Sequence, residues 1–391
     1  MTRRSIVIGL AKLTLLLVSL VISLLFGELA LRILGYQAIY EVYSKPSILW
    51  QPDELLGWSH EPGAEGRYVG PRPWPIEFDS PVSINSLGLR GPEVEPIADE
   101  GARILVLGDS IVAGFEVRQE ETFVAVLGDL LGEELDFPIQ TINAGVRGYG
   151  TDQSYLYFRE RGRLLEPDVV VMWLTPNDLV NDITVHRMRR VFGKAAFVPD
   201  GEHGLRLIGA PVPDYPECSE YRISSGGEIV RLDSRVGRVV CRLQMALFDR
   251  SALFSFLTHL VLWDQWGTLL RKLYNAGMPQ GRSDKGEAAL LIENTSNKVT
   301  ERIIPELART VEASGARFIV ASQPNMLQKF ADAGIDLSGY EQIHLASVEK
   351  ADPLDVRFEH DSHLNAKGHR MAAEELRDAL LPVLLEMRSE P

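Results

Sequence analysis

The feature of this chain that most constrains its fold is an alternation of short apolar runs with longer amphipathic stretches, which begins at Arg103. The apolar runs have the length of buried strands, and they lie at 104–107, 139–142, 168–174 and 317–321. Helical spacing of apolar residues is found at 122–131, 151–165, 300–313 and 366–387. Thr151 is the expected N-cap of the second of these helices. Strands that alternate with helices predict an α/β fold in which helices cover both faces of a parallel sheet.

The first apolar run ends in Gly108-Asp109-Ser110, which places a serine hydroxyl at the carboxyl end of a strand. Serine is inert unless a histidine removes its proton and nearby donors stabilise the resulting oxyanion. Further polar clusters follow at 143–150, 175–178 and 360–369. In a doubly wound sheet these clusters are expected to converge on one crevice. Together they supply a nucleophile, a glycine amide, an amide side chain and a carboxylate with an imidazole, which acyl transfer requires.

Four blocks follow one another along the chain: Gly108-Asp109-Ser110, Gly148, Asn177-Asp178 and a terminal Asp with His363. In these blocks and in their order, the chain resembles the SGNH hydrolase superfamily, also called GDSL esterases and lipases. The resemblance covers residues 103–385 and implies a three-layer, flavodoxin-like α/β/α fold. It implies Ser110 as nucleophile and His363 as general base and then acid. The N–H groups of Ser110 and Gly148 and the side-chain amide of Asn177 would form the oxyanion hole. The chain has no G-x-S-x-G elbow around Ser110, which separates it from the α/β-hydrolases.

The carboxylate behind His363 departs from the family pattern. The family usually places its aspartate three residues before the histidine, where this chain has His360. Asp361, two residues before, is the nearest carboxylate and is assigned the role of orienting the imidazole. Glu359 is the reserve candidate. Asp109 and Asp178 are interpreted as hydrogen-bonding braces of their loops rather than as catalysts.

The histidines near the carboxyl end also suggest a competing metal site, in which a bound ion would activate water. Its ligands would be His360, Asp361, His363 and His369. That hypothesis leaves Ser110 without a role, and the histidine spacings match no familiar zinc signature. The sequence therefore predicts no metal and no cofactor, and His369 is expected to cap or brace the terminal helix.

The amino-terminal segment predicts a membrane anchor. Residues 5–27 are apolar or small apart from Lys12, which is enough to span a bilayer as a helix. Arg3 and Arg4 precede the segment, so the amino terminus is expected in the cytoplasm. A cleaved signal peptide is the alternative, but no A-x-A-like site follows the apolar run. Residues 1–35 are therefore predicted to be a single-pass signal anchor, with the catalytic domain outside the cytoplasm, in the periplasm or at the cell surface.

The remaining chain is predicted to comprise two further parts. Residues 36–100 form an extracytoplasmic linker or wrapping segment, and residues 101–391 form the hydrolase domain with a mainly helical insertion at 183–293. Within the insertion, residues 244–274 are unusually apolar, which fits a lid, an acyl-chain site, a bilayer contact or two helices packed on the core. Cys218 and Cys241 either form a disulfide, worth about 3 kcal/mol, or remain two buried thiols.

The formal net charge of −14 argues against a nucleic-acid partner, because that function needs a basic face. The expected partners are the membrane and an acyl-ester substrate, which could be a lipid, a glycan or a small molecule. The favoured function is a serine esterase. An O-acyltransferase that modifies an envelope or exported polysaccharide stays open, as does a non-catalytic binding or assembly protein with the same fold.

Overall fold

The centre of the computed structural model is a five-stranded parallel sheet with the order β14-β13-β7-β5-β6. The structure describes residues 3–34, 50–70, 76–96, 101–188, 190–201, 204–248, 250–263 and 287–389. The sheet consists of β5 (Ala102–Gly108), β6 (Ile139–Gly145), β7 (Val169–Trp173), β13 (Arg317–Ser322) and β14 (Glu341–His344). This order is that of flavodoxin-like proteins, in which the chain reverses direction beside the first strand.

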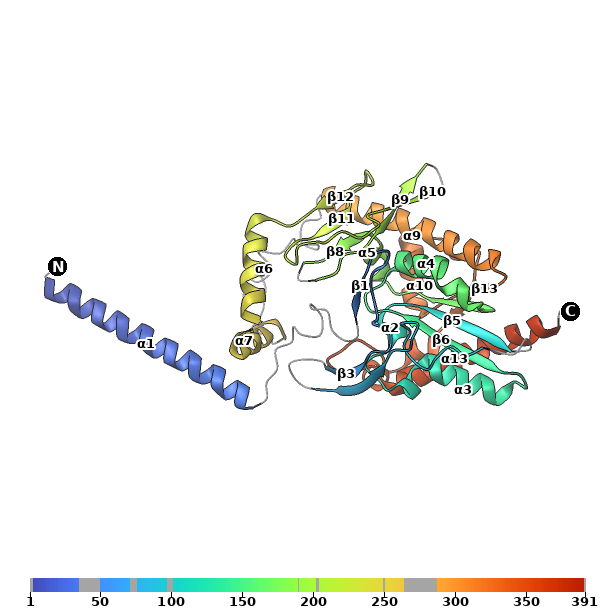
Figure 1. Ribbon diagram of the computed structural model, residues 1–391, viewed down its shortest axis with the longest axis horizontal. Helices are drawn as coiled ribbons and strands as arrows, with labels where there is room; N and C mark the ends of the chain where they lie inside the picture. Colours follow the sequence, from blue (N-terminus) through green and yellow to red (C-terminus); the bar gives the residue numbers. More distant parts are fainter. Residues whose placement is uncertain are drawn as a thin grey trace.

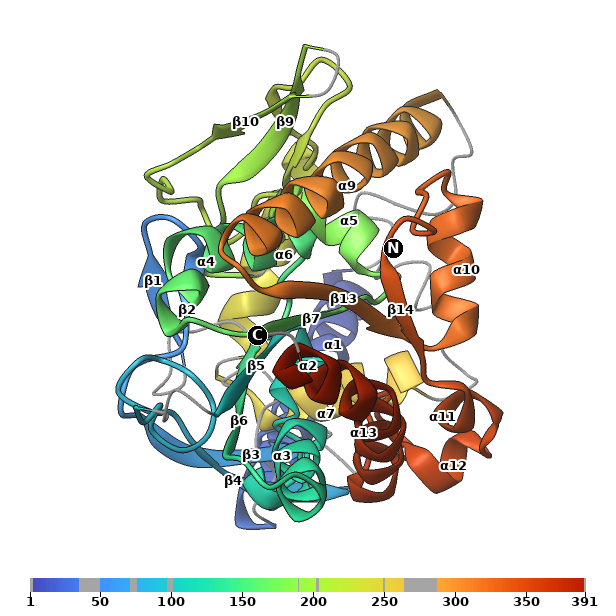
Figure 2. The ribbon, with the colours of Figure 1, turned by 90° about the vertical axis from the view of Figure 1, so that its right-hand side faces the viewer.

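Helices cover both faces of the sheet, as predicted (Figures 1 and 2). Strand β5 shows why, because Leu105 and Leu107 enter one core while Ile104 and Val106 enter the other. Each such side chain contributes about 1.5–3 kcal/mol on burial. The first face is covered by α4 (Thr151–Glu160) and α9 (Glu287–Ala313), and the second by α3 (Phe123–Glu134) and α13 (Ala366–Ser389). Shorter helices are α2 (Ser110–Ala113), α5 (Asp178–Ile183), α10 (Pro324–Asp332), α11 (Ala346–Lys350) and α12 (Pro353–Val356).

Two local features differ from the sequence prediction. The edge strand β14 was not predicted, because its residues Glu-Gln-Ile-His form no apolar run. The expectation that Thr151 caps α4 is wrong: Gly150 is the N-cap, and Thr151 is the first helical residue. The Thr151 hydroxyl instead donates to Asp182 Oδ2 of α5 at 2.7 Å. A contact between helices has therefore replaced a local cap.

Residues 50–70 and 76–96 wrap around the domain close to the carboxyl edge of the sheet. They form the pairs β1 (Gln51–Asp53) with β2 (Gly57–Ser59), and β3 (Glu65–Gly70) with β4 (Phe78–Ser83). Tyr68 and Phe78 pack in one cluster with Phe115. The indole N–H of Trp58 donates to the Arg147 carbonyl at 3.1 Å. This segment therefore supplies aromatic side chains to the edge where the site lies.

The insertion begins with strands and continues with helices. Its strands are β8 (Thr184–His186), β9 (Ala196–Asp200), β10 (Gly204–Ile208), β11 (Tyr221–Ile223) and β12 (Ile229–Arg231). They precede α6 (Arg235–Phe248) and α7 (Ala252–Trp263), and Cys218 is joined to Cys241 of α6 by a disulfide. The part of the predicted helical stretch at 264–274 lies outside the described residues.

The amino-terminal helix α1 (Arg3–Ile33) projects away from the domain (Figure 1). Its stretch Ile8–Ile33 contains a window with a mean hydropathy of 2.4, and residues 8–26 are exposed. By length and composition, this helix fits a membrane anchor.

Candidate active site

Ser110 is the first residue of the one-turn helix α2, directly after β5. The Asp109 carboxylate caps this helix by accepting the N–H of Ile111 at 3.0 Å. Helix α2 lies so close to β6 that a Cβ on Gly145 would stand 2.4 Å from the Ala113 nitrogen. Only glycine fits there without a shift of the backbone. The Ser110 hydroxyl is thereby placed beside a cavity of about 260 Å³ at the carboxyl edge of the sheet.

His363 reaches Ser110 from the loop between α12 and α13. Its Nε2 lies 2.8 Å from the Ser110 Oγ, within hydrogen-bond distance. A β-bridge between Arg357 and Leu364 closes the loop on either side of the histidine. The His363 side chain is 16% exposed, so the hydroxyl–imidazole pair is largely shielded from bulk water. This geometry suits proton transfer from the hydroxyl to the ring.

Asp361 lies on the opposite side of the imidazole ring. Its Oδ1 accepts hydrogen bonds from both the Nδ1 and the backbone N–H of His363, the latter at 3.0 Å. Burial alone would raise its pKa, but the hydrogen bonds from His363 and the nearby charge of Arg147 hold the pKa of Asp361 below its ordinary value. An ionised Asp361 keeps the proton of the neutral ring on Nδ1, which leaves Nε2 as the acceptor for the Ser110 hydroxyl.

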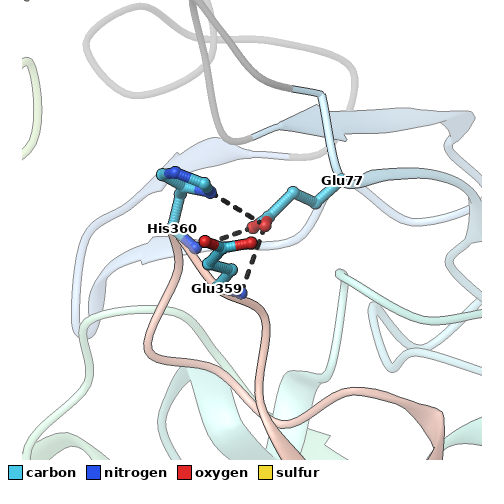
Figure 3. A group of neighbouring side chains, drawn as sticks. All are labelled: Glu77, Glu359 and His360. Atoms are coloured by element: carbon cyan, nitrogen blue, oxygen red, sulfur yellow. Dashed lines mark hydrogen bonds and ion pairs between the residues drawn. The ribbon is translucent and has the colours of Figure 1, made fainter. Parts of the chain in front are cut away.

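Glu359, the reserve candidate, belongs to a different cluster (Figure 3). The Glu77 carboxylate accepts the backbone N–H groups of Glu359 at 3.1 Å and of His360 at 3.0 Å. It also contacts the His360 Nδ1 at 3.0 Å. Glu77 thus holds the loop that leads to Asp361. The carboxylate hydrogen-bonded to His363 is that of Asp361, two residues before the histidine.

Glu116 is a residue that the sequence analysis missed. Its side chain is fully buried, forms an ion pair with Arg147, and places Oε1 3.4 Å from the His363 Nδ1. Glu116, Asp361 and His363 therefore have ligand atoms within 4.8 Å of one another. The Arg147 cation on Glu116 makes this group better suited to an imidazolium than to a metal ion. The only sequence signal was a single carboxylate between the apolar residues Phe115 and Val117.

The three predicted oxyanion donors, Ser110, Gly148 and Asn177, line the same cavity. The Ser110 N–H stands at a helix start and has no intrahelical acceptor. Among the described residues, no group accepts a hydrogen bond from the N–H of Ser110 or of Gly148. Gly148 has a φ of 80°, which side-chain-bearing residues rarely adopt. The Asn177 amide donates one hydrogen to Asp109 Oδ2 at 2.8 Å, and its second hydrogen is left for a ligand.

Asp109 and Asp178 brace the loops around these donors, as predicted. Asp109 Oδ2 also accepts the Thr175 hydroxyl at 3.2 Å, and Asp178 Oδ2 accepts the Thr175 N–H at 2.7 Å. Burial, together with the charges of Asp109 and Asp182, raises the pKa of Asp178 well above its ordinary value. These contacts connect the end of β5 to the loop after β7.

The structure does not gather the residues of the competing metal hypothesis. His360 contacts Glu77, whereas His363 contacts Ser110. His369 is buried in α13, where its Nδ1 accepts the Phe123 N–H at 3.1 Å. Burial lowers the pKa of His369 to about 3, so the ring stays neutral. His369 therefore braces the terminal helix against α3.

Comparisons with known proteins agree with this assignment at the level of the family. Residues 106–225 match the model of the GDSL-like Lipase/Acylhydrolase family. A search of curated proteins found no match. Solved structures that are similar to this one include TesA, at 12% identity (72% of this chain and 99% of that chain covered, TM-score 0.37). A family 3 carbohydrate esterase from Clostridium thermocellum is similar at 11% identity (73% and 98% coverage, TM-score 0.37).

A catalytic mutant of an acetylxylan esterase from Geobacillus stearothermophilus is similar at 10% identity (73% and 96% coverage, TM-score 0.35). All three TM-scores are too low to carry an argument about substrate. The family match spans β5 to β11 and includes Ser110, Gly148 and Asn177. Over residues 106–225, this chain thus matches the GDSL-like Lipase/Acylhydrolase family, whose members are hydrolases that act on ester bonds.

Proposed function

We propose that this protein is a serine esterase that cleaves acyl esters through an acyl-enzyme on Ser110. One observation carries the proposal: the Ser110 Oγ lies 2.8 Å from the His363 Nε2, while Asp361 accepts the hydrogen bond from the Nδ1 side of the same ring. A hydroxyl, a base and an orienting carboxylate in this order of contacts are what nucleophilic serine catalysis requires.

In the first half-reaction, the Ser110 Oγ attacks the ester carbonyl carbon as His363 Nε2 takes the hydroxyl proton. The carbonyl oxygen becomes an oxyanion, which the N–H groups of Ser110 and Gly148 and the Asn177 amide would stabilise. The tetrahedral intermediate collapses, the C–O bond to the alcohol breaks, and His363 gives its proton to the departing alcohol. In the second half-reaction, water attacks the acyl-enzyme by the same steps and releases the acid.

The direct test is hydrolysis of para-nitrophenyl acetate by the wild type and by Ser110→Ala. The substitution should lower kcat by at least about 10³-fold, because the nucleophile is lost. Ser338→Ala is a matched control, since Ser338 is exposed on the loop before β14, and it should retain wild-type activity. Equal activity of the wild type and Ser110→Ala would refute the proposal.

Transfer to a sugar hydroxyl is the second candidate function. The cavity beside Ser110 is walled by Trp50, Trp58 and Phe192, and flat aromatic side chains suit the face of a sugar ring. Transfer differs from hydrolysis only in the hydroxyl that resolves the acyl-enzyme. Product analysis with an acceptor glycan separates the two, because a transferase yields an acylated glycan that a hydrolase does not.

The third candidate is a binding or assembly protein without catalysis. It predicts that the wild type and Ser110→Ala behave alike with every acyl ester. The Ser110–His363 hydrogen bond favours the esterase, since a binding role alone gives no reason for it.

Helix α1 supports a location at the membrane, where it would anchor the protein with its amino terminus in the cytoplasm and the domain outside. The 26 residues of Ile8–Ile33 extend about 39 Å as a helix, longer than a hydrocarbon core of about 30 Å. Arg3 and Arg4 on the amino-terminal side favour a cytoplasmic start. The Cys218–Cys241 disulfide supports an oxidising compartment for the domain.

The carboxyl end of α1 docks on the insertion near α7. The Glu28 carboxylate accepts the N–H groups of Ala252 at 3.0 Å and Leu253 at 2.8 Å, and Arg32 donates to the Arg250 carbonyl at 2.7 Å. In Figure 1, α6 and α7 lie between α1 and the sheet. Exposed apolar side chains on α6 recur at helical spacing at Val236, Val239, Leu243 and Leu247. Such a row beside the anchor supports contact between the insertion and the bilayer.

A pair of carboxyl-terminal fusions tests this topology. Fused alkaline phosphatase should be active and fused green fluorescent protein dark if the domain is outside the cytoplasm. The reverse pattern would contradict the proposed location without affecting the proposed chemistry.

A further inference from the structure

The cavity beside Ser110 has a cationic wall, although the chain as a whole carries a net charge of −14. Among the described residues, its lining includes Arg147, Arg187, Arg190 and Lys194 but no Asp or Glu. A concave site with one sign of charge concentrates ligands of the opposite sign. The contribution of each cation depends on its own partners, because a cation that is neutralised within the protein attracts a ligand far less than one that is not.

Arg147 and Lys194 are each paired with a carboxylate of the protein. Arg147 forms an ion pair with the buried Glu116. Lys194 is buried and forms an ion pair with the buried Asp152. Both pairs complete the wall and hold it in place, and neither adds much net positive charge to the cavity.

Arg187 differs from these two. Its guanidinium donates to the side-chain oxygen of Asn181, which is a neutral group. The Glu220 carboxylate favours the Arg187 charge, but Glu220 is itself paired with Arg222 at 2.8 Å. Loss of solvent, together with the cations Arg190 and Arg222, lowers the pKa of Arg187 to about 10, so the side chain is still charged near neutrality. An anion bound at Arg187 would relieve this unfavourable environment.

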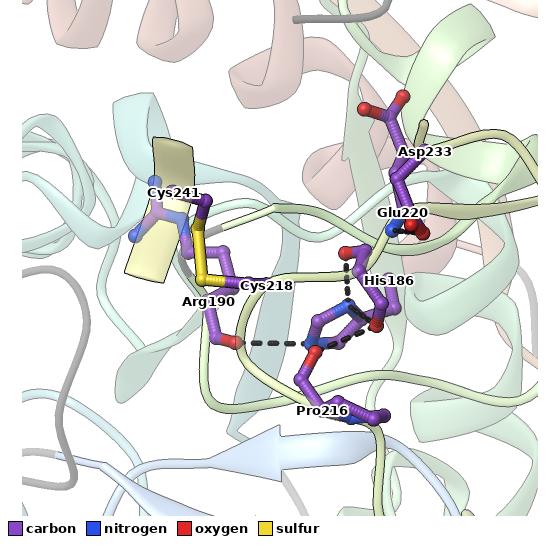
Figure 4. Close-up of a disulfide and its surroundings, with 8 residues drawn as sticks. His186, Arg190, Pro216, Cys218, Glu220, Asp233 and Cys241 are labelled. Atoms are coloured by element: carbon purple, nitrogen blue, oxygen red, sulfur yellow. Dashed lines mark hydrogen bonds between the residues drawn. A yellow bond between two sulfur atoms is a disulfide. The ribbon is translucent and has the colours of Figure 1, made fainter. Parts of the chain in front are cut away.

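The backbone at Arg190 is held by contacts with the His186 ring (Figure 4). The His186 ring lies between two backbone carbonyls, 2.8 Å from that of Ser219 and 2.9 Å from that of Arg190. Ser219 follows Cys218, whose disulfide to Cys241 ties this segment to α6. Arg187 and Arg190 both line the cavity and keep part of their side chains exposed, so a ligand in the cavity can reach them. The backbone that carries these arginines is thus braced before a ligand arrives, which reduces the entropic cost of binding.

From this wall we infer that the ester substrate carries an anionic group, a carboxylate or a phosphate, which binds Arg187 and Arg190 while its ester carbonyl lies at Ser110. The inference rests on the proposed esterase function and adds a substrate class to it. A guanidinium binds carboxylate or phosphate oxygens through paired, charge-assisted hydrogen bonds. The anion can belong to the acyl group or to the alcohol, since both flank the same carbonyl.

The test uses two pairs of esters that differ in one charge. On the acyl side, mono-para-nitrophenyl adipate is compared with para-nitrophenyl hexanoate. On the alcohol side, para-acetoxybenzoate is compared with its methyl ester. The readout is the ratio of kcat/KM for the anionic ester to that for the neutral ester. In at least one pair the wild-type ratio should exceed the Arg187→Gln ratio by about 10- to 100-fold, and that pair identifies the side that carries the anion.

Arg206→Gln is the matched control, because Arg206 is on β10 and does not line the cavity. It should keep the wild-type ratio. If Arg187→Gln does not fold, Arg190→Gln and the salt dependence of the wild-type ratio replace it. The wild-type ratio should fall from about 0.05 M to about 0.5 M NaCl, because salt screens the attraction.

Two negative results are distinguishable. In the first, hydrolysis depends on Ser110, but neither Arg187→Gln nor Arg190→Gln nor salt changes the kcat/KM ratios. This result overturns the anionic substrate and leaves the esterase function intact. If none of the four esters is hydrolysed in a Ser110-dependent way, the proposed function fails and the substrate class fails with it.

Discussion

Replacing Asp361 by Asn should remove most of the esterase activity, whereas replacing Glu116 by Gln should spare most of it. Both carboxylates are near the His363 Nδ1, but their contacts differ. Asp361 Oδ1 accepts from both the ring nitrogen and the backbone N–H of His363, so it fixes the tautomer and the orientation of the ring. The Asp361→Asn variant would lose the charge that stabilises the imidazolium, and kcat should fall by about 10³- to 10⁴-fold.

Glu116 acts across a longer distance and is already neutralised. Its Oε1 is 3.4 Å from the His363 Nδ1, beyond an ordinary hydrogen bond. An isolated charge at this distance would contribute about 5 kcal/mol at an effective dielectric constant of about 20. Arg147 on the same carboxylate cancels most of that effect. We expect Glu116→Gln to lower kcat by about tenfold at most, while loss of the buried ion pair with Arg147 lowers the free energy of unfolding by about 3 kcal/mol.

The assay is kcat for para-nitrophenyl acetate, with urea unfolding of each variant to separate activity from stability. Glu359→Gln is the control, because Glu359 lies beside Glu77 rather than His363, and it should keep wild-type kcat. The reasoning is refuted if Glu116→Gln loses as much activity as Asp361→Asn. Loss of activity in Glu359→Gln alone would overturn the assignment of Asp361.

Three further predictions concern stability. Burial lowers the pKa of His60 to about 4 and of His369 to about 3. Because the unfolded chain then binds more protons below pH ~6.5, each histidine should lower the free energy of unfolding by about 2 kcal/mol by pH ~5. In urea titrations, His369→Gln should remove about half of this pH dependence. A wild-type free energy of unfolding that does not change with pH would contradict the prediction. Gly145→Ala should lower the free energy of unfolding by about 1–3 kcal/mol through its clash with α2, and it should also lower kcat. Gly132→Ala, in open space on α3, should raise the free energy of unfolding by up to about 1 kcal/mol. Equal melting temperatures of Gly145→Ala and the wild type would refute the clash. Cys241→Ser should lower the free energy of unfolding by about 3 kcal/mol, since the bond closes a separation of 23 residues, and unchanged unfolding would exclude that contribution.

Much of the fold could be predicted from the sequence because its signals are local. The run at 104–107 lies within β5, whose residues are buried throughout, and it leads directly to Ser110. The other predicted strands fall on β6, β7 and β13. The fifth strand, β14, escaped because an edge strand with polar residues has no periodic apolar pattern.

The parts of the site that could not be predicted depend on contacts between distant residues. Glu116 and Arg147 are 31 residues apart, and Glu116 meets His363 only in the folded protein. Arg187 gave no signal as a single arginine in a mixed segment, because its role depends on which carboxylates surround it. Thr151 had the side chain of a helix cap, but its hydroxyl bonds Asp182 of α5 instead. The residue type predicts which hydrogen bonds a side chain is able to form. The tertiary structure decides which of these bonds it forms.

Covalent labelling of Ser110 would show whether this serine is the nucleophile. The full-length protein would be treated with a fluorophosphonate ester and its peptides sequenced by mass spectrometry, with Ser110→Ala as the control. One phosphonyl adduct is expected, on Ser110, which is absent from the Ser110→Ala variant and slow to form in Asp361→Asn. An adduct on another residue, or the absence of an adduct on Ser110 in a protein that hydrolyses esters, would contradict Ser110 as the nucleophile.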